Sequence, residues 1–81
     1  MRAIETGMKA IFLLMGRYNC KPLLTFSESC SEIGKALQTG YNEMNQGTFP
    51  LPVQRSGNKM YGDIRDVAEY LDSQRAKALA T

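Results

Sequence analysis

Between positions 35 and 46, side chains with hydrogen-bonding groups recur at intervals of three and four residues. They are Gln38, Thr39, Asn42 and Glu43, with Asn45 and Gln46 beyond them. Amide side chains form paired hydrogen bonds with adenine, a threonine packs on the thymine methyl group, and a carboxylate accepts from the cytosine amine. The same residues also suit a solvated helix face. Taken by themselves, they favour that second interpretation.

Two cations flank a turn signal at Ser56-Gly57-Asn58, in a stretch from 47 to 62 that contains no acid. Arg55 and Lys59 there could reach DNA phosphates or the minor groove, which adds affinity without reading sequence. Asn58 would lie between them. The alternative is a pair of surface cations that keep a hairpin edge from pairing with other chains. Lys35 could contact phosphate from the start of the preceding helix.

The residue types argue against catalysis and against a metal. The chain has no histidine, so Ser27 and Ser29 lack the base of a histidine-dependent triad. Cys20 and Cys30 form no C-x-x-C pair, so a zinc site built from this chain alone is not expected. Carboxylates spaced by three on the last helix are expected to form a solvated stripe. We therefore predict no enzyme and no cofactor; the carboxylates are Asp63, Asp66, Glu69 and Asp72.

Length and composition predict one small cytoplasmic domain. Eighty-one residues with 43% apolar content can bury a modest core and are too apolar for disorder. The net charge of +2 is compatible with nucleic acid but does not argue for it strongly. The run Ala10–Met15 is far shorter than the ~20 residues that span a bilayer, and the cysteines form no disulfide framework. We expect a flexible stretch over 1–7 and one domain over 8–81.

The first half of the domain is expected to be helical. Apolar residues from Met8 to Tyr18 recur at helical spacing, although a buried strand over 10–15 is the competing assignment. Thr25-Phe26-Ser27-Glu28 has the form of a capping box, so a helix should begin there and end near Gly34. A second helix should run from Lys35 to Gln46. Two short helices joined by a tight turn form a helix-turn-helix.

In the second helix, an apolar stripe should face the core; it comprises Leu37, Tyr41 and Met44. Gly40 lies inside that helix and costs about 1 kcal/mol relative to alanine, so tertiary packing must hold it. Five of the chain's seven aromatic side chains are expected in the core rather than stacked on bases; they are Phe26, Tyr41, Phe49, Tyr61 and Tyr70.

The second half predicts a hairpin and a final helix. The prolines in Phe49–Val53 require extended backbone, and strands on either side of Ser56-Gly57-Asn58 would form a hairpin. Asp63 should cap the last helix, whose apolar positions match a helical template. The fold class predicted is mainly α with a small β-hairpin wing, a winged helix-turn-helix.

Three motifs in this order resemble a known family. They are Phe12-Leu13-Leu14-Met15 with Arg17-Tyr18, Gly47-Thr48-Phe49-Pro50-Leu51-Pro52-Val53, and Asp66-Val67-Ala68 with Tyr70-Leu71-Asp72. The pattern resembles the pyocin activator protein family and is similar to phage excisionases and AlpA-like regulators, over roughly residues 10–76.

The resemblance implies a winged helix-turn-helix of the MerR/excisionase kind that binds double-stranded DNA. Such a protein would be encoded by a phage or genomic island, as a transcriptional regulator (activator) or as an excisionase that directs recombination. It implies an integrase or RNA polymerase as partner, several copies on DNA, and no membrane. The DNA contacts expected from it are Lys35, Gln38, Thr39, Asn42, Glu43, Arg55, Asn58 and Lys59.

The chain departs from the AlpA-like pattern where basic residues usually stand, in the recognition helix and before Phe-Pro. Those positions here are Asn42, Asn45, Gln46 and Thr48. This departure and the acidic last helix favour an alternative, an antirepressor-like protein-interaction module that keeps the fold without binding DNA. Binding to DNA therefore depends on Arg55, Lys59 and a polar helix face.

Overall fold

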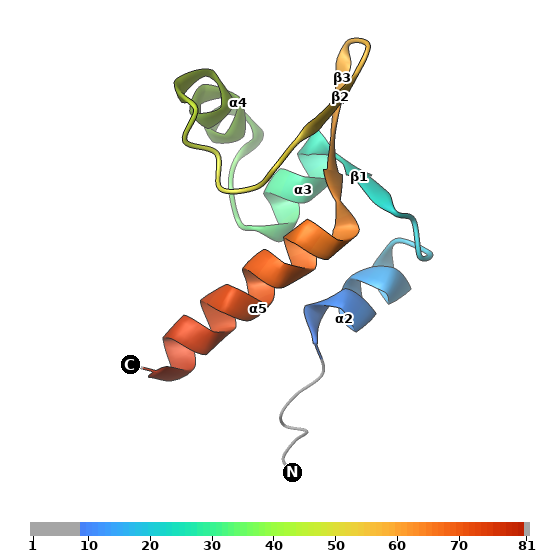
Figure 1. Cartoon of the computed structure of the whole chain (residues 1–81), viewed down its shortest axis with the longest axis vertical. Coiled ribbons are helices and arrows are strands. Elements are labelled where there is room, and N and C mark those ends of the chain that lie inside the picture. The colour runs from blue at the N-terminus through green and yellow to red at the C-terminus, as the bar shows by residue number, and fades with distance from the viewer. Residues whose placement is uncertain (1–8, 81) are drawn as a thin grey trace.

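The computed structural model describes residues 9–80, and the stretch 1–7 that was expected to be flexible lies outside them. Within these residues the chain forms four helices and a three-stranded antiparallel sheet (Figure 1). The expectation of a mainly helical chain with a small β-hairpin is confirmed. In chain order the elements are α2 (Ala10–Arg17), β1 (Leu23–Thr25), α3 (Phe26–Glu32), α4 (Leu37–Gln46), β2 (Gln54–Ser56), β3 (Lys59–Asp63) and α5 (Ile64–Ala80).

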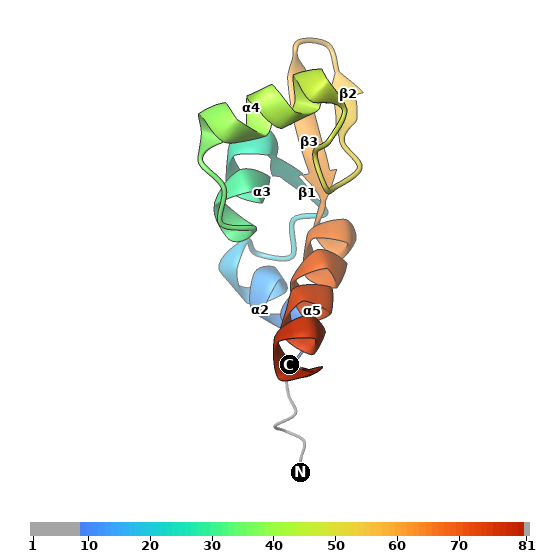
Figure 2. The same cartoon turned by 90° about the vertical axis from the view of Figure 1, so that its left-hand side faces the viewer.

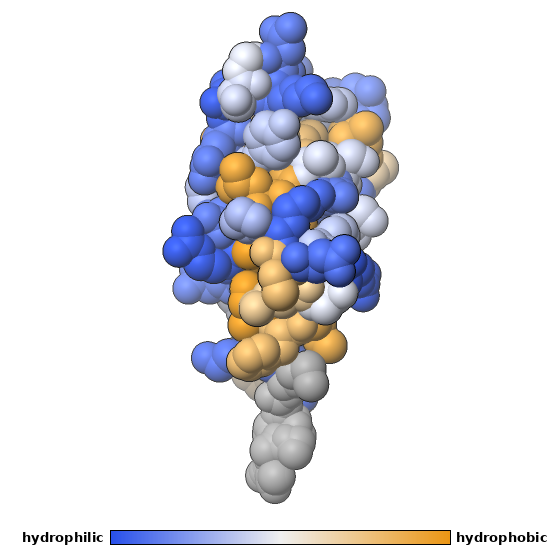
Figure 3. All heavy atoms as spheres, turned by 90° about the vertical axis from the view of Figure 1, so that its right-hand side faces the viewer, coloured by the Kyte–Doolittle hydropathy of each residue, from blue (hydrophilic) through white to orange (hydrophobic). Residues whose placement is uncertain are grey.

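The first apolar run is a helix, as favoured over a strand, but only one side of it belongs to the core. Ala10 and Leu14 are buried against α5, and the Ala10 amide donates to Asp72 Oδ1 at 3.0 Å. Phe12 and Leu13 point away and are 61% and 57% exposed. The lower, apolar part of the surface in Figure 3 lies over this helix. The run is therefore half core and half surface.

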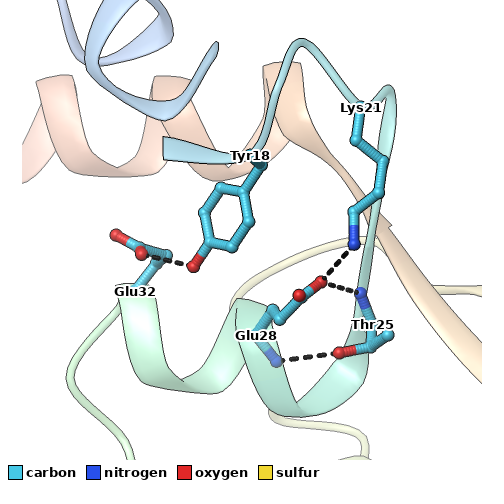
Figure 4. Close-up of polar contacts among 5 residues, drawn as sticks. All are labelled: Tyr18, Lys21, Thr25, Glu28 and Glu32. Atoms are coloured by element: carbon cyan, nitrogen blue, oxygen red, sulfur yellow. Dashed lines mark hydrogen bonds and ion pairs between the residues drawn. The ribbon is translucent and has the colours of Figure 1, made fainter. Parts of the chain in front are cut away.

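The predicted capping box at the start of α3 is confirmed (Figure 4). The Thr25 hydroxyl accepts from the Glu28 amide at 3.1 Å, and Glu28 Oε1 accepts from the Thr25 amide at 2.9 Å. Lys21 Nζ donates to the same Oε1 at 2.9 Å. Gly34, with φ +80°, turns the chain after the helix, because a left-handed conformation there suits glycine.

This box should make stability depend on pH. The Lys21 hydrogen bond, and then the Thr25 amide, hold the pKa of Glu28 below its ordinary value. The stabilisation is therefore present above about pH 4.3 and is lost as the pH falls through the lower folded-state pKa. We expect Glu28→Gln to lower the unfolding free energy by about 0.5 kcal/mol near neutral pH, since this partly exposed pair is screened by solvent.

The loss should shrink as the pH falls through the lowered folded-state pKa of Glu28 and the wild-type carboxyl also becomes neutral. Urea denaturation at about pH 7 and at about pH 3 measures the difference. Glu69→Gln, at an exposed position of α5, is the matched control and should change little. A loss of equal size at both pH values would contradict the assignment to charge.

Strand β1 was not predicted, and it completes the sheet. The strand order is β1-β3-β2, so β3 is central. Leu23 pairs with Asp63 and Thr25 with Tyr61, while the side chain of Leu24 between them is fully buried. A strand of three residues between a proline and a capping box is too short to leave a periodic pattern. Its pairing with β3 anchors the start of α3 to the start of α5.

Helix α4 begins at Leu37 rather than at Lys35, and its predicted apolar face is buried only in part: of its three side chains, Met44 is half-buried and the other two are exposed. The buried position is Gly40, where an added Cβ would lie 2.5 Å from Cys30 Sγ and 3.2 Å from the Phe26 ring. The missing side chain lets α4 lie directly on α3. The helix is consequently rotated, and Leu37 and Tyr41 are 40% and 41% exposed.

The predicted hairpin is confirmed with a tighter turn. Ser56 pairs with Lys59, so the loop is the two residues Gly57 and Asn58 rather than three. Gly57 has φ +62° and Asn58 does not have a positive φ. Glycine at the first central position is typical of a type II′ turn, whose twist matches that of the strands.

Helix α5 follows directly from β3 and packs against α2 (Figure 1). The Asp63 carboxylate accepts from the Arg65 amide at 2.8 Å, which confirms the predicted cap. Arg65 also holds the pKa of Asp63 below its ordinary value. The buried core joins α2, β1, the connection between α4 and β2, and α5; its residues are Ala10, Leu14, Leu24, Leu51, Ile64, Val67 and Ala68. From residue 9 to residue 80, no helix is both long and apolar enough to cross a membrane.

Candidate nucleic-acid interface

Helix α4 and the β2–β3 hairpin share one end of the molecule. Two perpendicular views show both at the upper end, with α2 and the second half of α5 at the lower end (Figure 1, Figure 2). We call the exposed side of α4 together with residues 55–61 the α4–hairpin surface. It contains six of the eight predicted DNA contacts; they are Gln38, Thr39, Asn42, Arg55, Asn58 and Lys59, all exposed.

The amides on the exposed side of α4 support one another. Gln38 Nε2 donates to Asn42 Oδ1 at 3.2 Å, a contact that residues four apart on a helix can make. The Asn42 oxygen keeps a second lone pair, and its NH₂ group keeps both donors. Asn42 can therefore still offer the donor and acceptor pair that adenine requires, in an orientation that Gln38 holds.

The other two predicted contacts, Lys35 and Glu43, bind each other instead of facing solvent. Lys35 Nζ lies 3.1 Å from Glu43 Oε2, and both side chains are only partly exposed. The pair ties the chain before α4 to the second turn of that helix. Burial, and next the charge of Glu43, raise the pKa of the Cys30 thiol beside it. The sequence could not show this pair, because it depends on the rotation of α4 about its own axis, which is set by the packing of Gly40 against α3.

The hairpin cations, like Lys9 and Lys77, form no ion pair within residues 9–80, whereas four other basic side chains do. Ion pairs elsewhere neutralise four basic side chains; the pairs are Arg17–Glu32, Lys21–Glu28, Lys35–Glu43 and Arg65–Asp63. Arg55 and Lys59 are exposed, and within residues 9–80 neither forms an ion pair. Their charge is consequently available to an anionic partner.

A hollow of about 330 Å³ separates α4 from the hairpin. Tyr41 lines it from α4, Lys59 lines it from the hairpin, and Phe26 contributes to its lining. The Tyr41 ring stacks on the Phe26 ring, with centroids 5.0 Å apart and planes 28° apart. Because the Tyr41 side chain is exposed, the expectation that it is a core residue is wrong. The full lining is Thr25, Phe26, Ser27, Tyr41, Asn58, Lys59, Met60 and Tyr61.

Away from this surface, a polar contact fixes α2 to α3 (Figure 4). The Tyr18 hydroxyl donates to Glu32 Oε2 at 2.6 Å, and Arg17 Nη1 donates to the same oxygen at 2.9 Å. Burial, and then the hydrogen bond to Glu32, raise the pKa of Tyr18 to about 12. The phenol is neutral at ordinary pH, so this contact serves the scaffold.

The acidic stripe expected on α5 is partly structural. Asp63 pairs with Arg65, and Asp72 accepts from the Ala10 amide. Two of the four carboxylates are thus occupied in the fold. In the described part of the chain, no group of three His, Cys, Asp or Glu side chains is placed to hold a metal ion.

Compared with models of protein families, with curated protein sequences and with solved structures, the chain shows no significant match. The functional argument therefore depends on the geometry and charge of the α4–hairpin surface.

Proposed function

We propose that this protein is a winged helix-turn-helix that binds double-stranded DNA, with α3 and α4 as the helix pair and the β2–β3 hairpin as the wing. The observation that supports this proposal is the position of the polar α4 face and of the two unpaired cations Arg55 and Lys59 at one end of the molecule. In proteins of this class a recognition helix enters the major groove, and flanking elements contact the backbone.

Within this class we propose a cytoplasmic regulator or excision factor encoded by a phage or genomic island. The order of the sequence motifs supports that assignment. With it we propose an integrase or RNA polymerase as partner. Base contacts would come from Gln38, Thr39 and Asn42, which are exposed in the first half of α4. That half of a recognition helix is the part that usually meets base edges.

A binding titration tests the proposal. We expect the protein to bind a short random-sequence duplex at low salt and to lose affinity steeply as salt increases. Binding releases counterions from the DNA, and the entropy gained by their release falls as the bulk salt concentration rises. Fluorescence anisotropy of a labelled duplex measures both. Absence of binding even at the lowest salt would overturn the DNA proposal.

Asn42→Ala should relax specificity at one base pair. Loss of a bidentate contact costs about 1–3 kcal/mol at the contacted pair and little elsewhere. Gln38→Ala should give a smaller change at the same pair, because Gln38 orients Asn42. Selection from a random duplex library, before and after each substitution, measures this. A uniform loss across all sequences would show that α4 does not read bases.

The exposed apolar side chains of α2 favour a second candidate, a protein-interaction module. Phe12 and Leu13 are adjacent and largely exposed, on helix α2, which lies at the end of the molecule remote from the hairpin (Figure 1, Figure 2). Apolar patches of this kind often contact another protein. If the duplex titration fails while Phe12→Ser with Leu13→Ser abolishes activity in the cell at unchanged stability, this candidate replaces the first.

A further inference from the structure

We infer that the hollow between α4 and the hairpin seats one phosphodiester group of the DNA backbone, held by the hydroxyl groups of Tyr41 and Tyr61 and the ammonium group of Lys59. This inference rests on the proposed function. It gives the two tyrosines a role in contacting DNA, beyond the side chains of the polar α4 face and the hairpin cations.

The chemistry of the lining suits an anion. It contains one cation, Lys59, and no carboxylate, and its other polar side chains are hydroxyls or amides that can donate. Within residues 9–80, neither tyrosine hydroxyl has a hydrogen-bond partner. The carboxylate nearest in sequence, Glu28, binds Lys21 and the Thr25 amide instead. A phosphate oxygen accepts hydrogen bonds only, so unoccupied donors around a cation match its needs.

The Tyr41 ring and the Tyr61 backbone are held in place before any ligand arrives. Tyr41 stacks on Phe26, which is itself buried. Tyr61 lies in the central strand and pairs with Thr25 on one side and Gln54 on the other. Donors fixed in this way lose little conformational freedom on binding. Phe26 and Met60 add apolar surface against which a deoxyribose can pack.

A phosphate seated here would connect the two DNA-contacting elements. The hollow is lined from α4 by Tyr41 and from the hairpin by Asn58 and Lys59. One backbone group held between them sets the register of α4 in the groove relative to the hairpin, because phosphate contacts position a protein on the duplex.

Tyrosine-to-phenylalanine variants test the inference with the rings kept in place. We expect Tyr41→Phe and Tyr61→Phe each to weaken binding to a random-sequence duplex about tenfold, the loss expected for a hydrogen bond to a charged group. The slope of log K against log salt should stay unchanged, because no charge is removed. Lys59→Gln should lower that slope by about one. Tyr70→Phe, on α5 outside the hollow, is the matched control and should bind normally.

Amide NMR shifts distinguish the source of the phosphate and separate this inference from the proposed function. With the duplex, we expect shifts at Ser27, Asn58 and Tyr61 alongside Gln38 and Asn42. Shifts at Gln38 and Asn42 with none in the hollow, and with normal binding by both phenylalanine variants, would overturn the inference and leave the proposed function standing. If inorganic phosphate saturates the amide shifts of the residues lining the hollow and the duplex does not, the inference that the bound phosphate belongs to DNA is overturned. Absence of any duplex binding overturns both.

Discussion

Gly40→Ala is expected to lower the free energy of unfolding by about 2 kcal/mol, although alanine is the better helix former. The new methyl group would lie 2.5 Å from Cys30 Sγ and 3.2 Å from the Phe26 ring. Both neighbours are buried, so neither can move aside freely, and overpacking of this kind costs about 1–3 kcal/mol. We place the cost at about 3 kcal/mol, against a gain in helix propensity of about 1 kcal/mol.

Gly16→Ala is the matched control, because Gly16 lies in α2 and an added Cβ there meets nothing within 4 Å. It should raise stability by up to about 1 kcal/mol. Adding Cys30→Ala to Gly40→Ala should recover much of the loss, since the clashing sulfur is removed. Urea denaturation of the four proteins in this double-mutant cycle measures the coupling. Strict additivity of the two substitutions would contradict the contact between α3 and α4.

Removing both hairpin cations should have the largest effect on DNA binding. We expect Arg55→Ala with Lys59→Ala to weaken binding to a random-sequence duplex about a hundredfold, about tenfold for each charge-assisted contact. The slope of log K against log salt should become shallower by about two, because two fewer counterions are released. Thermal unfolding should be unchanged, since both side chains are exposed and form no ion pair within residues 9–80.

Lys9→Ala with Lys77→Ala provides the control with the same net charge. Both lysines are exposed, and both lie outside the α4–hairpin surface. Anisotropy titrations of the two double variants over a series of salt concentrations compare them directly. If the control loses as much affinity as the hairpin variant, net charge rather than the hairpin determines binding, and the wing assignment fails.

Local signals in the sequence predicted the element boundaries well. The capping box at Thr25 and the cap at Asp63 use side chains within three residues of the backbone they bind, and the turn at Gly34 depends on the backbone conformation of that residue. Such interactions are visible in the sequence because they need no distant partner. Strand β1 was missed for the opposite reason: Leu24 pairs with Gly62, which is remote in the chain.

The candidate site was predicted less well than the fold, and α4 shows why. Apolar periodicity assigned Leu37 and Tyr41 to the core, but the close approach at Gly40 turns both outward. A glycine adds nothing to an apolar count, although it permits the tightest packing of any residue. The same rotation brings Lys35 to Glu43 and removes two side chains from the predicted contacts. Rotation of a helix about its axis is set by tertiary packing, which periodicity alone does not describe.

The strand order β1-β3-β2 also determines when the molecule can fold. Strand β1 is the first strand to be synthesised, and its only neighbour in the sheet is β3. Beside this pairing, the Pro22 carbonyl accepts from the Ile64 amide at 2.9 Å. The pairing of β1 with β3 closes a loop of chain that contains α3, α4 and β2. The entropy cost of closing this loop must be met before the contacts between β1 and β3 can stabilise the fold. A nascent chain that ends before Lys59 therefore lacks the central strand, and the segment from β1 to β3 should acquire its structure in one cooperative step.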